Sequence, residues 1–245
     1  MSCPNAAPSP LRKGPPTAFA GRTTLGTRHI VAVHIDGEYK VAQYGQWDGY
    51  PSGQGATVLD FLHNGNVEGL KRNLAKTYVP TEDDHKRMWA EVGHDIVESK
   101  GMVPWGKSEE FAKLYPSLHR NTGAKILAFI ASHDGEDRIP LENEIAFVGE
   151  SLFCEWAYVI DFDIGTFEVF KGFNKVGPAP EGSRFHDVAW DTEYKSSEGE
   201  TYYQVTLARS WKLDALPTLE DFIEAFQEPD TAMNAGAAAD AGQPV

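Results

Sequence analysis

The dipeptide Asp36–Gly37 constrains the fold more than any other feature of this chain. It separates two runs rich in β-branched and aromatic residues, 30–35 and 39–44. Asp–Gly between two such runs is the strongest local signal for a tight type I′ turn, in which both central residues take positive φ. The sequence therefore predicts a β-hairpin near the start of the ordered chain.

A two-residue turn also predicts how the two strands of this hairpin pair. His29 is expected opposite Tyr44, and Thr27 opposite Gln46. Because directly opposed side chains project to the same face, these four residues are expected to gather at the open end of the hairpin. A slip of one residue would move them to the other face.

A loop dense in glycine and aromatic residues, 47–55, follows the hairpin. Polar groups that converge beside aromatic side chains are the usual composition of a ligand pocket, and glycine lets a backbone approach a ligand closely. The alternative is a structural turn, in which Asp48 caps its own backbone and the aromatic side chains pack into the core. The candidate ligand-binding residues are His29, Gln43, Tyr44, Trp47, Tyr50 and Gln54.

Helical patterns dominate the middle of the chain and also its end. Apolar residues recur at helical spacing through much of 56–132. Thr81 is followed by three acidic residues, which is typical of the capped start of a helix. Thr218 is expected to cap a closing helix in the same way.

A second hairpin is predicted in the last third of the chain. The runs 155–162 and 166–170 are rich in strand-forming residues and flank a turn at 163–165. Two hairpins on either side of a helical block predict a single α+β domain over 26–227. Its core is expected to be an antiparallel β-sheet, as one sheet or two stacked sheets, covered by helices.

The two flanks of this domain have a different composition. Residues 1–25 are rich in Pro, Ala, Ser and Thr, and the first acidic residue of the chain is Asp36. Residues 228–245 are rich in Ala, Gly and Asp and show no periodic pattern. Both segments lack the material for a packed core, so we expect a disordered leader and a disordered tail.

The net charge limits which partners the protein can bind, and the cysteine content indicates its cellular compartment. The 245 residues carry 22 Lys+Arg against 36 Asp+Glu, a formal net charge of -14. Such a chain repels phosphate backbones and anionic membranes, so neither nucleic acid nor membrane is an expected partner. No apolar run approaches the roughly 20 residues needed to cross a bilayer. Only two cysteines occur, Cys3 and Cys154, which favours a reducing cytoplasm.

The common cofactor and metal motifs find no match. No phosphate-binding glycine loop or dinucleotide fingerprint follows a strand, and no histidine pair has metalloprotease spacing, so no cofactor and no metal are predicted. Cys154 is expected to be a buried small apolar residue rather than a nucleophile. Asp161 interrupts an apolar strand and needs a partner, for which Arg120 and Arg209 are the candidates.

Several of these segments together resemble a known family. Residues 26–29 and 36–55, with 121–127 and 156–161 further on, look like an uncharacterised family found in phages, bacteria and filamentous fungi. The resemblance spans about 30 to 225 and implies no activity. Family members typically begin at the Gly–Thr–Arg segment, which would make residues 1–25 either an upstream extension or a segment that is not translated.

The start of the ordered segment is also similar to N-terminal-nucleophile (Ntn) hydrolases. In those enzymes the chain is cut before Thr, Ser or Cys, and the freed α-amine acts as base for that side chain. Cleavage between Gly26 and Thr27 would make Thr27 the nucleophile, with Gln46 or Asp48 orienting the amine or substrate. The hypothesis is hydrolysis of an amide bond in a small molecule.

A second hypothesis from a different class is a non-catalytic binding module. It would bind a small molecule or a basic host protein, as a phage accessory or antagonist protein does. The strong acidity of the chain would attract a basic partner and accelerate encounter. The sequence predicts no oligomeric state.

Overall fold

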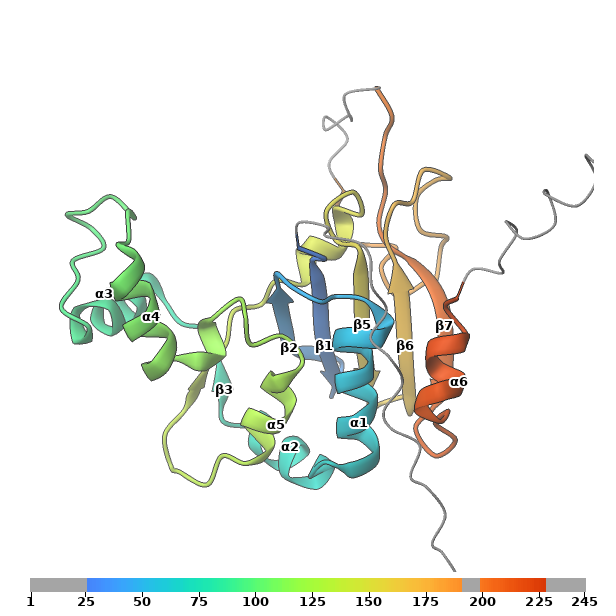
Figure 1. The fold of residues 1–245 in the computed structure, drawn as a ribbon, viewed down its shortest axis with the longest axis horizontal. Coiled ribbons are helices and arrows are strands. Elements are labelled where there is room, and N and C mark those ends of the chain that lie inside the picture. The colour runs from blue at the N-terminus through green and yellow to red at the C-terminus, as the bar shows by residue number, and fades with distance from the viewer. Residues whose placement is uncertain (1–25, 191–198, 228–245) are drawn as a thin grey trace, which may run out of the picture.

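The structure is a computed structural model that describes residues 26–190 and 199–227. The predicted disordered leader, 1–25, and tail, 228–245, lie outside the described residues. The centre of the described structure is a five-stranded sheet in the order β2–β1–β5–β6–β7 (Figure 1). The strands of this sheet are β1 (His29–Ile35), β2 (Glu38–Gly45), β5 (Trp156–Asp161), β6 (Thr166–Lys171) and β7 (Thr206–Lys212).

The predicted α+β class is confirmed, but the sheet is mixed rather than antiparallel. The β1–β2, β5–β6 and β6–β7 pairs are antiparallel, whereas β1 and β5 run parallel. The two predicted hairpins are therefore present, and the long helical segment between them acts as a crossover that brings β5 beside β1 in the same direction. The only other sheet among the described residues is the two-residue pair of β3 (Thr77–Tyr78) and β4 (Ile139–Pro140), too small to form a second stacked layer.

Helices cover one face of the five-stranded sheet. Side chains of α1, α2, α5 and α6 pack there against the odd-numbered positions of β1, among them Val31 and Val33. Figure 1 shows α3 and α4 set apart from this layer, beyond the β2 edge of the sheet. The helices are α1 (Ala56–Asn64), α2 (Val67–Leu74), α3 (Glu82–Glu91), α4 (Trp105–Leu114), α5 (Lys125–Ala131) and α6 (Leu219–Glu224).

Loops cover the opposite face. The short helix η3 (Ile145–Gly149) and the chain around Phe185 and Val205 pack there on Ile30 and Ala32 of β1. This second, smaller core lies over even-numbered positions of β1, as the alternation of side chains along a strand requires.

Local sequence signals set several element boundaries as predicted. Asp36 and Gly37 take φ of 55° and 74°, which a type I′ turn needs. The hydroxyl of Thr81 accepts a hydrogen bond from the Asp84 N–H, and Thr218 does the same for Asp221. Within the described part of the chain, none of the helices has the length and apolar character needed to cross a membrane.

Candidate functional site

The segment at Gly26 and Thr27 lies against the loop that follows β2. The Thr27 carbonyl accepts a hydrogen bond from the Gly49 N–H at 3.0 Å. Gly26 has φ of +51°, and a Cβ there would come within 2.9 Å of the Gln46 carbonyl oxygen. The hairpin thus brings the two sequence stretches together as expected, but Thr27 itself is only 3% exposed.

The imidazole of His29 is enclosed in this region. The side chain is fully buried, its Nδ1 lies 3.4 Å from the Thr27 carbonyl oxygen, and its Nε2 has no hydrogen-bond partner among the described residues. Burial lowers the pKa of His29 from 6.5 to about 4. His29 is therefore a neutral imidazole at physiological pH.

The predicted grouping of His29 with Tyr44 on one face is wrong. A register shift between Val33 and His34 places His29 opposite Gly45, and Tyr44 opposite Ile30. A bulge of this kind adds one residue to one strand, and every later side chain then points to the other face. The Tyr44 ring consequently lies edge-on to Phe147 in the loop-covered core, with ring centroids 5.1 Å apart.

Hydrogen bonds from side chains to backbone groups hold the loop in place. Gln54 donates to the Trp47 carbonyl at 3.4 Å and accepts from the Ala124 N–H at 2.8 Å. The Tyr158 hydroxyl donates to the Gly49 carbonyl at 2.7 Å. These contacts make Gln54 a brace between the loop, including the π-helical turn η1 (Pro51–Gly55), and the start of α5.

Three further predicted residues lie at the outer side of the loop. Trp47 is 46% exposed, and its indole N–H donates to the Asn121 Oδ1 at 3.1 Å. Tyr50 is 38% exposed, and Asp48 is exposed with φ of 56°. The structural interpretation of the loop, with these aromatic rings buried in the core, therefore fails for both Trp47 and Tyr50.

Gln43 and Gln46 complete the candidate residues and connect β2 to a neighbouring segment. The Gln43 amide donates to the His119 carbonyl, and the Gln46 N–H donates to the Arg120 carbonyl. The Gln46 side-chain oxygen accepts from the Tyr44 hydroxyl at 2.6 Å. The end of β2 thereby fixes the position of the segment 118–121.

A cavity of about 670 Å³ opens between that segment and α4. Four of its residues lie at positions i, i+3, i+4 and i+7 of α4 and so share one helix face. The other wall contains the short segment whose backbone is bound by β2 and whose Asn121 binds Trp47. The lining residues are Trp89, Trp105, Ser108, Glu109, Phe111, Ala112, Lys113, Leu118, His119, Arg120 and Asn121.

The charges in this cavity differ from those of the chain as a whole. Lys113 and Arg120 line it, against the single carboxylate of Glu109. Neither cation forms an ion pair with any residue in the described part of the chain. Burial and the nearby Arg120 charge lower the pKa of His119, which favours its neutral form. A site with a positive balance thus lies within a protein of net charge -14.

Two residues singled out from the sequence lie outside this cavity. Cys154 is fully buried, and burial raises the pKa of its thiol, as expected for a packing residue. The partner of buried Asp161 is neither Arg120 nor Arg209 but Arg184, whose Nη2 donates to the Asp161 Oδ2 at 2.6 Å. Arg184 also pairs with Glu168 and comes from a loop, so no strand pattern pointed to it.

Comparison with protein-family models, curated proteins and solved structures gives no match for this chain.

Proposed function

We propose that this protein binds a small planar aromatic anion in the cavity between α4 and residues 118–121. The observation that carries the proposal is the combination, in one cavity, of accessible indole rings and two cations that pair with no carboxylate among the residues described. Concave sites with aromatic walls and a few polar groups are the usual form of small-molecule sites. The proposal belongs to the second of the two hypotheses from the sequence, a non-catalytic module that binds a small molecule.

The aromatic wall is suited to stacking. Trp89 lies on Phe111 with ring centroids 3.9 Å apart and an interplanar angle of 14°. Trp105, at the first turn of α4, is 77% exposed. An aromatic ligand would cover the face of this indole and remove apolar surface from water, with additional stabilisation from ring–ring contact.

The cations favour a ligand with a negative group. Lys113 and Arg120 would bind a carboxylate, sulfonate or phosphate, and the guanidinium can bind it through two parallel hydrogen bonds. The rest of the acidic surface would repel the same anion. Charge therefore directs an anionic ligand to this cavity rather than to other apolar surface.

Three residues of the 36–55 motif support this proposal, because they hold one wall of the cavity in place. Gln43 and Gln46 bind the backbone of the cavity wall, and Trp47 binds the side chain of Asn121. The motif residues thereby position Arg120 and Asn121. We therefore propose that Gln43 and Gln46 shape the cavity from behind its wall and that Trp47 lies at its margin.

A binding titration with 8-anilinonaphthalene-1-sulfonate, a fluorescent aromatic anion, tests the proposal. We expect one site per chain, with the dissociation constant raised about tenfold (about 1.4 kcal/mol) by Trp105→Ala and by Arg120→Gln. Both residues are exposed, so both variants should fold. The neutral analogue N-phenyl-1-naphthylamine should lose the dependence on Arg120 while keeping that on Trp105.

Arg209→Gln is the matched control, because it removes an equal charge from an exposed site on β7. Its affinity for the anion should equal that of the unaltered protein. Affinity that is unchanged in both Trp105→Ala and Arg120→Gln would show that the probe binds elsewhere and would refute the proposal.

Hydrolysis by Thr27 is the second candidate, and one contact favours it. The Thr27 backbone is hydrogen-bonded to Gly49 and lies beside the loop that carries Gln46 and Asp48. An Ntn mechanism requires cleavage after Gly26, which would free the α-amine and open access to the enclosed hydroxyl. Intact-mass measurement of the purified protein tests it, since a mature chain that retains Gly26 cannot use this mechanism. Thr27→Ala should abolish both cleavage and amide hydrolysis while the fold is retained.

A further inference from the structure

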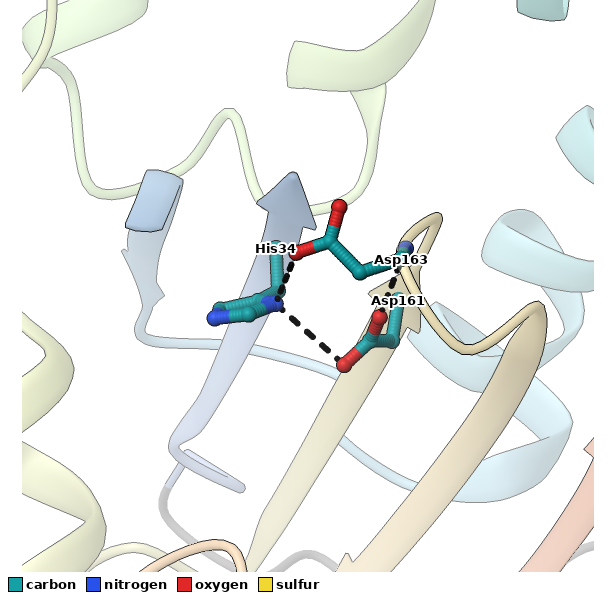
Figure 2. A group of neighbouring side chains, drawn as sticks. All are labelled: His34, Asp161 and Asp163. Atoms are coloured by element: carbon teal, nitrogen blue, oxygen red, sulfur yellow. Dashed lines mark hydrogen bonds and ion pairs between the residues drawn. The ribbon is translucent and has the colours of Figure 1, made fainter. Parts of the chain in front are cut away.

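The carboxyl ends of the parallel strands β1 and β5 bring a histidine and two aspartates together. His34 lies next to Asp161 in the β1–β5 register, and Asp163 follows in the turn after β5. Figure 2 shows the three side chains converging from two neighbouring strands and the adjoining turn. This cluster is at the opposite end of β1 from His29 and outside the cavity at α4.

The atoms that face one another are suited to binding a metal ion. The Nδ1 of His34 lies 3.3 Å from the Asp161 Oδ2 and 3.2 Å from the Asp163 Oδ2. All three atoms lie within 4.8 Å of one another. Nitrogen and oxygen ligands bind zinc at about 2.0–2.2 Å, so neighbouring ligands of one tetrahedral ion are about 3.3–3.6 Å apart. The two nitrogen–oxygen distances, 3.3 and 3.2 Å, are at or just below the short end of this range.

Backbone and guanidinium donors orient both carboxylates. Asp163 accepts from the N–H groups of Asp36 at 2.8 Å and Gly37 at 2.9 Å, which ties it to the β1–β2 turn. Asp161 accepts from the Asp163 and Ile164 N–H groups through Oδ1 and from Arg184 through Oδ2. Each oxygen that faces His34 accepts one of these hydrogen bonds. A carboxylate oxygen has a further lone pair, so each can still bind a metal ion. Such outer contacts are what orient the ligands in metal sites.

The ring nitrogen that faces the carboxylates lacks a hydrogen bond. Nδ1 of His34 is buried and, although close to both oxygens, makes no hydrogen bond of acceptable geometry with any described residue. The ring is held edge-on to Tyr39, with centroids 4.9 Å apart. A neutral imidazole held in this way presents the Nδ1 lone pair to the space between the two oxygens.

The local charge favours a divalent cation. Asp161, Asp163 and Glu168 supply three negative charges, and Arg184, which binds Asp161 and Glu168, supplies one positive charge. These four side chains carry a balance of two negative charges, which one divalent ion would cancel. The His34 and Asp163 side chains are 20% and 34% exposed, which gives an ion access from solvent.

We propose that His34, Asp161 and Asp163 form a binding site for a divalent transition-metal ion, with Zn²⁺ the best match to one imidazole and two carboxylates. Three protein ligands leave at least one coordination position open to solvent or to another ligand. Softer sulfur donors are absent from the site, and the imidazole disfavours Mg²⁺ and Ca²⁺, which prefer all-oxygen sites.

Calorimetric titration of the full chain with ZnCl₂ tests the site. We expect one ion per chain at this site, and at least a tenfold weaker affinity in His34→Gln and in Asp163→Asn. Asp163→Asn keeps a side-chain oxygen for the β1–β2 turn, and circular dichroism checks that the variant is folded. Titration with Co²⁺ gives an independent readout, because its visible absorption bands report coordination by protein ligands and should weaken in the same variants.

Asp187→Asn is the matched control, because Asp187 is a fully exposed carboxylate that also lies near a histidine, at 4.0 Å from the His186 Nε2. Its affinity for Zn²⁺ should equal that of the unaltered protein. The proposal is overturned if the protein binds no Zn²⁺, or if His34→Gln and Asp163→Asn bind it as tightly as the control. In either case the contacts of His34 with the two aspartates are only ion pairs.

Discussion

The imidazole of His29 lies against the α-carbon of Gly45, with no room for a side chain between them. A Cβ at Gly45 would lie 2.1 Å from Cε1 and 2.2 Å from Nε2 of His29. The pairing of His29 with Gly45 across β1 and β2 thus depends on glycine at this position. The Thr27 carbonyl and the His29 side chain also exclude a side chain at Gly49, where a Cβ would lie 2.6 Å from the Thr27 oxygen and 2.9 Å from the His29 Cβ.

Gly45→Ala should therefore destabilise the protein by about 1–3 kcal/mol, because the buried ring must shift into a closely packed core. Chemical denaturation followed by circular dichroism measures this loss. Gly106→Ala is the control: a Cβ there meets nothing within 4 Å, and the residue lies within α4, where alanine is the better helix former. Equal stability of the two variants would contradict the packing of His29 against Gly45.

Acid should destabilise the protein through His29. Burial lowers the pKa of His29 from 6.5 to about 4. Between these values the unfolded chain takes up a proton that the folded chain does not, so the free energy of unfolding falls as the pH drops from 6.5 towards 4. The expected loss from His29 between pH 7 and pH 5 is about 2 kcal/mol.

Denaturation curves at pH 7 and pH 5 measure this effect by comparison between variants. The fall in stability should be smaller in His29→Gln by about that amount, whatever the variant's own stability. His63→Gln, at an exposed histidine, should keep the full pH dependence. A His29→Gln variant with the same pH dependence as the unaltered protein would show that this imidazole is not held neutral.

Tyr158→Phe should cost about 1–3 kcal/mol of stability, because it leaves the buried Gly49 carbonyl without the hydroxyl that donates to it at 2.7 Å. The loop after β2 should also become more open to exchange, which hydrogen–deuterium exchange at Gly49 and its neighbours measures. Tyr78→Phe is the control, because the Tyr78 hydroxyl has no hydrogen-bond partner among the described residues. Equal stability and equal exchange in the two variants would show that the hydrogen bond from Tyr158 to Gly49 does not hold the loop in place.

Arg184→Gln should destabilise the protein by about 3 kcal/mol, because it leaves the carboxylates of Asp161 and Glu168 buried without their cation. Thermal and chemical denaturation measure the loss. The exposed Arg209 gives the matched control, and Arg209→Gln should change stability by less than about 0.5 kcal/mol. Similar losses in the two variants would mean that Arg184 is not the main counter-charge of this cluster.

Features that depend on a few neighbouring residues could be predicted from the sequence. The Asp36–Gly37 turn needs only positive φ at two residues, and the caps at Thr81 and Thr218 need only a hydroxyl before a helix. The second hairpin followed equally from its own two runs and turn. These parts of the fold are fixed by local chemistry.

Two features, one within the first hairpin and one between distant segments, could not be predicted. The shift between Val33 and His34 leaves no mark in the sequence of the turn, and it separated His29 from Tyr44. The parallel contact of β1 with β5, and with it the approach of His34 to Asp161, joins residues far apart in the chain. No spacing rule for metal ligands covers such a pair, so the sequence predicted no metal at these residues.

One wall of the cavity at α4 does have a signal in the sequence. Trp105, Ser108, Glu109 and Ala112 have the spacing of one helix face, and this face carries an indole that the small local core does not bury. The opposite wall could not be found in this way. It depends on Gln43 and Gln46 reaching the backbone of 119–120.

The parallel contact between β1 and β5 has a consequence for synthesis of the protein on the ribosome. The chain from Gln46 to Glu155 must emerge before β5 can join β1, which takes roughly 5 to 20 seconds at ordinary translation rates. During that interval the inner edge of β1 has no partner strand, and an isolated two-stranded hairpin is only marginally stable. The nascent β1–β2 hairpin therefore offers chaperones an unpaired strand edge until β5 has been made.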